Sequence, residues 1–68
     1  MRKNKVLKAL AHLGEDLDMY YDRRGGSWVF YGPLTYSWAQ TRTHIARLSD
    51  LNLQQWIALG EQMSKNLI

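Results

Sequence analysis

The chain has no cysteine among its 68 residues. Disulfide bonds and thiolate metal sites therefore cannot stabilise it. The two histidines, His12 and His44, cannot by themselves complete a four-ligand zinc site, so we expect neither a metal nor a cofactor. A lack of cysteine is typical of proteins in reducing compartments, which predicts a cytoplasmic location.

Long apolar runs are also missing from the sequence. No stretch approaches the roughly 20 apolar residues that cross a membrane, so we expect no membrane partner. The basic N-terminus is not followed by the apolar segment of a signal peptide. The length predicts one small domain over residues 1–68, close to the lower limit for a self-sufficient core. A homodimer is one way for such a chain to gain the missing stability.

Catalytic motifs are absent as well. Serine, histidine and aspartate residues are all present, but none stands in a motif that would make it a nucleophile or a general base. The sequence therefore predicts a protein that is not an enzyme.

What the chain does have is a concentration of aromatic residues. Seven of its eight aromatic side chains lie between Tyr20 and Trp38. Large aromatic side chains supply most of the apolar area that a small core can bury. We expect the core to contain Trp28, Phe30, Trp38 and Trp56.

The centre of this aromatic stretch predicts a β-hairpin over residues 17–31. If residues 23–26 form the loop, Tyr21 pairs with Trp28 and Met19 with Phe30, which gives one apolar face. The other face is mixed in character. Gly32 and Pro33 should end the second strand, because proline cannot donate a hydrogen bond to a sheet.

Helices are predicted on both sides of the hairpin. Asn4 can cap a first helix, and Gly14 can end it in a left-handed turn. Ser37 and Gln40 fit a capping box for a second helix from Trp38, which breaks at residues 49–50. A third helix should follow a second capping box, formed by Asn52 and Gln55, with Leu51 and Trp56 as a hydrophobic staple. Gly60 lies inside this helix, and we expect another backbone to approach it closely.

The predicted fold class is therefore α+β: an N-terminal helix, an antiparallel β-hairpin and two C-terminal helices. The alternative is an all-α protein, in which the first helix continues to Tyr21.

The mixed face of the hairpin is the candidate protein-binding site. Tyr20 and Tyr31 lie together on it beside Val29, and tyrosine is enriched in protein interfaces. The charged members of the candidate site are Asp18, Asp22, Arg23 and Arg24.

A DNA-binding regulator is the alternative. Residues 38–66 match a helix-turn-helix pattern, with amide side chains at the start of the second helix, where adenine-reading residues lie. The net charge of +3 is compatible with phosphate contacts. The candidate nucleic-acid-binding residues are Lys5, Lys8, Arg42, Arg47, Asn52, Gln54 and Gln55.

The order helix, strand, Gly26-Ser27, strand over about residues 4–33 resembles the start of the HicA-type toxins, small RNA-cleaving proteins with a double-stranded-RNA-binding-like fold. Trp28 stands where that family carries its catalytic histidine. The resemblance therefore does not imply nuclease activity for this chain.

We expect a non-enzymatic protein that binds a macromolecular partner stoichiometrically, as an inhibitor, adaptor or regulator. A protein partner is favoured over nucleic acid because Asp18 and Asp22 flank the tyrosines and would repel phosphates. Small cysteine-free domains of this kind are typical of accessory proteins of phages and mobile elements.

Overall fold

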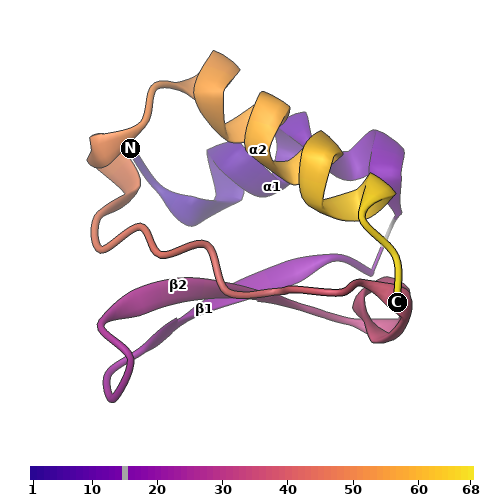
Figure 1. The fold of residues 1–68 in the computed structure, drawn as a ribbon. Helices are drawn as coiled ribbons and strands as arrows, with labels where there is room; N and C mark the ends of the chain where they lie inside the picture. The colour runs from indigo at the N-terminus through magenta and orange to yellow at the C-terminus, as the bar shows by residue number, and fades with distance from the viewer. Residues whose placement is uncertain (15) are drawn as a thin grey trace.

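The protein folds into two layers, a helical layer and a β-hairpin (Figure 1). The computed structural model describes residues 1–14 and 16–68. Its helices and strands are α1 (Lys3–Ala9), β1 (Asp18–Asp22), β2 (Ser27–Tyr31) and α2 (Leu53–Lys65). Both helices lie over the same face of the hairpin. The α+β class and the hairpin are confirmed. Of the three predicted helices, the first and the third form, whereas the second, predicted from Trp38, is absent from the described residues.

The hairpin has the register that the sequence predicts. Met19 pairs with Phe30 and Tyr21 with Trp28, across a turn of residues 23–26. Gly26 has a left-handed backbone, with φ of 68°, which glycine adopts without steric cost. The all-α alternative is wrong, because β1 already begins at Asp18.

Helix α1 is shorter than predicted. Arg2 rather than Asn4 is its N-cap, so Asn4 lies within the first turn of the helix. The chain then turns through a short 3₁₀ segment, Ala11–Leu13, and Gly14 is extended rather than left-handed, with φ of 165°. The short helix still contributes to the core, because Val6 within it and Leu10 at its C-cap are fully buried.

The second helix predicted from Trp38 does not form. Residues 40–45, called the edge segment below, instead run beside β2: Phe30 N donates to Thr41 O over 2.9 Å, and Thr43 N donates to Trp28 O over 3.0 Å. The side chain of Ser37 bonds Leu34 O rather than capping a helix. The edge segment satisfies backbone groups of β2 that a helix at this position would leave unpaired.

A bulge interrupts the edge segment at His44, whose φ is 61°. Trp28 N donates to Ile45 O instead of to a residue directly opposite. The Thr43 hydroxyl joins the two sides, because it donates to Trp28 O over 2.8 Å and accepts from Ile45 N over 3.1 Å. Ile45 lies two residues beyond Thr43, which is opposite Trp28 in the register of Val29 with Arg42, and extra residues of this kind bend a strand and redirect its side chains.

Helix α2 begins as predicted. Gln55 N donates to Asn52 Oδ1 over 2.8 Å, and Asn52 N donates to Gln55 Oε1 over 2.9 Å, which is a reciprocal capping box. The neighbour of Gly60 differs from the expectation. A Cβ there would lie 2.7 Å from a methyl carbon of Leu10, so a side chain, and not a backbone, approaches this glycine.

The core lies between the helices and the inner face of the hairpin. Phe30, Trp38 and Trp56 are buried there as predicted, but Trp28 is only half-buried near the turn of the hairpin. The buried apolar cluster consists of Val6, Leu10, Leu17, Met19, Phe30, Trp38, Trp56 and Met63.

Candidate protein-binding site

The outer face of the hairpin is the side away from both helices (Figure 1). Alternation along the strands directs Met19 and Phe30 into the core and Tyr20 and Tyr31 outward. The side chains of Tyr20 and Tyr31 remain 47% and 44% exposed. As expected from the sequence, the two tyrosines lie together on an exposed face of the sheet.

The two tyrosines form an ordered pair. Their ring centroids are 5.4 Å apart and the rings meet edge to face at 63°. This is an energetically favourable geometry for two aromatic rings. The Tyr31 hydroxyl donates to Asp18 Oδ2 over 2.9 Å. This bond fixes the orientation of the Tyr31 ring.

Asp18 is itself held by three groups. Met19 N donates to its Oδ1 over 2.7 Å, and Lys3 Nζ of α1 lies 3.6 Å from the same oxygen. The Met19 N–H, followed by the Tyr31 hydroxyl and Lys3, lowers the pKa of Asp18 below its usual value. The same carboxylate raises the pKa of the Tyr31 hydroxyl. At neutral pH, an ionised Asp18 therefore faces a protonated Tyr31.

A second carboxylate joins the hairpin turn to the edge segment. Arg42 Nη2 donates to Asp22 Oδ2 over 2.8 Å, and Arg42 Nη1 donates to Ser27 Oγ over 3.1 Å. The Arg42 guanidinium, with the backbone N–H groups of Gly25 and Arg24, lowers the pKa of Asp22. A Cβ at Gly25 would collide with this guanidinium, so a larger residue there would displace the Arg42 side chain from its ion pair.

Acid should weaken the outer face through these two carboxylates. Because the folded-state pKa of each lies below its unfolded value of about 3.9, both stabilise the fold above about pH 4, and this contribution is lost as the pH falls through the folded pKa. We expect the urea midpoint of the wild type to fall in that window. The double variant Asp18→Asn, Asp22→Asn should start lower at neutral pH and decline less. Parallel declines for the two proteins would contradict this assignment.

Val29 does not contribute exposed surface to the site. It pairs with Tyr20 on one side and with Arg42 on the other, and its side chain is only 7% exposed. Arg23 and Arg24 lie exposed in the turn. The sequence therefore predicts the face on which Tyr20 and Tyr31 lie, but Val29 is covered on that face rather than exposed.

The candidate nucleic-acid residues do not form one surface suited to a helix-turn-helix. Residues 38–47 contain no helix, so the first helix of that motif is missing. The side chains of Asn52 and Gln55 already form the capping box of α2. Arg42 is bound to Asp22 in the sheet. Of the remaining candidates, Lys5 and Lys8 are exposed on α1, and Arg47 and Gln54 are exposed in the C-terminal half of the chain.

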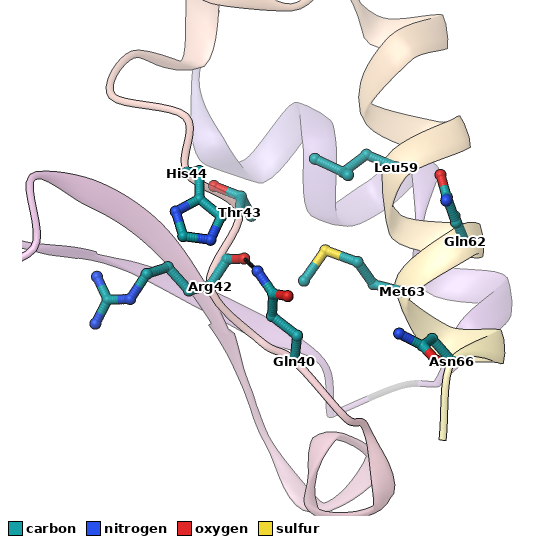
Figure 2. A pocket seen from close by; sticks show the side chains of 8 residues that line it. All are labelled: Gln40, Arg42, Thr43, His44, Leu59, Gln62, Met63 and Asn66. Atoms are coloured by element: carbon teal, nitrogen blue, oxygen red, sulfur yellow. Dashed lines mark hydrogen bonds between the residues drawn. The ribbon is translucent and has the colours of Figure 1, made fainter. Parts of the chain in front are cut away.

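One hollow was not anticipated from the sequence. It has a volume of about 290 Å³ and lies between the edge segment and the C-terminal half of α2 (Figure 2). Thr41, Thr43 and Ile45 alternate with polar residues, and this β-branched alternation is the signal that could have predicted a strand on one side of it.

The described residues limit other kinds of site. Within residues 1–14 and 16–68, no group of three or more histidine, cysteine, aspartate or glutamate side chains could hold a metal ion. Over the same residues, the helices are too short and too polar to cross a membrane. A comparison of the chain with protein-family models, with curated proteins and with solved structures finds no match.

Proposed function

We propose that this protein binds a protein partner stoichiometrically through the outer face of its hairpin, as an inhibitor, adaptor or regulator without chemistry of its own. The observation that carries the proposal is the edge-to-face pair of Tyr20 and Tyr31 on a sheet face away from both helices. Tyrosine pairs of this kind suit the centre of an interface, because they bring large contact areas at a low entropic cost.

The fixed geometry of Tyr31 supports this function. Its hydroxyl is already bonded to Asp18, so the ring needs little ordering when a partner docks. Tyr20 contacts the same ring and extends the apolar surface. The proposed interface therefore has an aromatic centre with charged residues around it.

Ion pairs around the tyrosines weaken the argument that free carboxylates would repel phosphate, so the preference for a protein partner rests on the tyrosine pair. Asp18 and Asp22 are each paired with a cation, Lys3 and Arg42 respectively, so neither is the free negative charge that the sequence suggests. Arg42 is equally unavailable to phosphate without breaking its ion pair. The exposed Arg23 and Arg24 would mainly increase the association rate with an acidic partner.

Removal of either tyrosine ring should weaken partner binding strongly. We expect Tyr20→Ala and Tyr31→Ala each to cost about 2 kcal/mol, which is about 30-fold in Kd, since buried aromatic anchors dominate interface energies. The partner is isolated by pull-down from host lysate with and without nuclease treatment, and Kd is then measured by calorimetry with the purified partner. Tyr36→Ala is the matched control, because Tyr36 is 85% exposed but lies outside the pair.

Two results would overturn the proposal. Loss of capture after nuclease treatment, with binding that falls steeply as salt rises and responds to Lys5→Ala or Arg47→Ala, would identify nucleic acid as the partner. Equal effects of Tyr20→Ala and Tyr36→Ala would exclude the tyrosine pair as the interface. Sedimentation at micromolar concentration distinguishes a further case, in which a second copy of the chain covers the same face as a homodimer.

A further inference from the structure

The hollow beside the edge segment is a groove with an apolar floor and a polar rim. Leu59 and Met63 of α2 provide the apolar surface, and the rim carries Gln40, His44, Gln62 and Asn66 (Figure 2). Its volume of about 290 Å³ lies just below the range of small-molecule sites, which begins at about 300 Å³. The space therefore suits one or two side chains better than a cofactor.

In the described part of the chain, the edge segment has unpaired backbone groups on the side that faces away from β2. Thr41 and Thr43 direct their backbone bonds toward β2, so the backbone groups of Gln40 and Arg42 point to the opposite, open edge. Among the residues that the structure describes, the N–H groups of Gln40 and Arg42 donate to no acceptor. This is the hydrogen-bonding pattern that an added strand completes.

The side chain of Gln40 makes a hydrogen bond of the kind that an added strand would make with this edge. Its Nε2 donates to Arg42 O over 2.9 Å, and this contact is drawn as a dashed line in Figure 2. A carboxamide N–H has the chemistry of a peptide N–H. Because Gln40 is exposed, a peptide can displace its side chain at little cost.

Just before the edge segment, the chain already pairs with another extended segment. Ala39 N donates to Asn66 O over 2.8 Å, and Ile68 N donates to Ser37 O over 2.9 Å. Trp38 and Leu67 are antiparallel partners there. This pairing ends at Ala39, before the outward N–H groups of Gln40 and Arg42.

We propose that the edge segment binds an extended peptide from a partner protein, which adds a strand beside residues 40–42 and places an apolar side chain in the groove. Strand addition obtains affinity from the backbone and specificity from a side-chain pocket. The peptide side chain is apolar because Leu59 and Met63 form the floor and Arg42 is already paired with Asp22. This site is separate from the tyrosine pair and does not depend on the function proposed above.

The probe is a phage-displayed library of short random linear peptides, selected on the full chain and followed by synthesis of one enriched peptide. Amide hydrogen exchange with that peptide bound should slow about tenfold or more at Gln40 and Arg42. The Thr43 amide, already bonded to Trp28 O, is the internal control and should change little. Absence of enriched peptides, or slowed exchange that appears elsewhere than at the edge segment, would overturn the proposal.

Two matched pairs of variants test the groove and the edge separately. Gln62→Trp places an indole across the groove and should weaken the synthetic peptide about tenfold or more, whereas Gln54→Trp, exposed on the same helix outside the groove, should not. Gln40→Pro removes the outward N–H and should weaken binding relative to Gln40→Ala, which keeps it. Equal affinities within either pair would overturn the proposal, and thermal melts verify that each variant folds.

Two further controls separate this site from the tyrosine interface and from self-association of the chain. Tyr20→Ala should leave peptide affinity unchanged, so failure of the tyrosine interface and failure of the groove are distinguishable. Concentration-dependent slowing of exchange at Gln40 and Arg42 without any peptide would show that a second copy of the chain occupies the edge, and would overturn the assignment to a partner peptide.

Discussion

Replacement of Trp56 by alanine should remove a large part of the protein's folding free energy. Trp56 is fully buried and its ring meets Phe30 edge to face, with centroids 6.4 Å apart. Truncating a buried tryptophan costs about 3–5 kcal/mol. At about 0.05–0.15 kcal/mol per residue, a chain of this length has a total stability of only about 3–10 kcal/mol.

The indole N–H adds to this expected loss. Trp56 Nε1 donates to Leu48 O over 2.8 Å and so joins α2 to the turn that precedes it. Trp56→Phe keeps most of the apolar contact but leaves that carbonyl without its donor, and its effect should be intermediate.

Urea denaturation followed by circular dichroism measures both variants of Trp56. Trp28→Ala is the matched control, because Trp28 is half-buried near the hairpin turn and should cost less than Trp56→Ala. A larger effect at Trp28 than at Trp56 would mean that the core lies closer to the hairpin turn than the structure indicates.

Gly32→Ala should be the most damaging single-methyl change in the hairpin. The φ of Gly32 is 139°, and an added Cβ would lie 2.5 Å from the backbone oxygen of Asp16. The strained backbone costs about 1–3 kcal/mol, and a collision with backbone cannot be relieved by a side-chain rotation. We expect a loss on the order of 3 kcal/mol, measured as a shift in urea midpoint.

Gly26→Ala separates the two contributions to that loss. Gly26 also has a positive φ, of 68°, but an added Cβ would meet no atom within 4 Å. Its substitution should therefore cost only about 1 kcal/mol. Similar losses at Gly26 and Gly32 would show that the contact with Asp16 is unimportant.

Gly32 also matters for the proposed interface. It follows Tyr31 directly, and its close approach to Asp16 holds the end of β2 against the start of β1. That is where the Tyr31 hydroxyl bonds Asp18. Partner affinity should fall in Gly32→Ala even where the variant remains folded, because the Tyr31 ring loses its fixed position.

The hairpin and the start of α2 could be predicted because their signals are local. The alternation of Met19 and Tyr21 against Trp28 and Phe30 sorts both strands in one register only, and that register is observed. The capping box of α2 closes within four residues, between Asn52 and Gln55. For the candidate site, this local pattern was enough to place Tyr20 and Tyr31 on one face.

Only the tertiary structure decided the state of residues 38–47 and, with it, the groove. Thr41 and Ile45 fit a helical stripe with Trp38, but they also fit the alternation of a strand with Thr43. The N–H groups of Trp28 and Phe30 on the free side of β2 require acceptors, and Ile45 O and Thr41 O supply them. The sequence by itself determined the elements whose partners are near neighbours. The choice between helix and strand for the edge segment depended on hydrogen bonds to residues more than ten positions away, because an unpaired backbone at the edge of a sheet costs more than a weak local preference for helix.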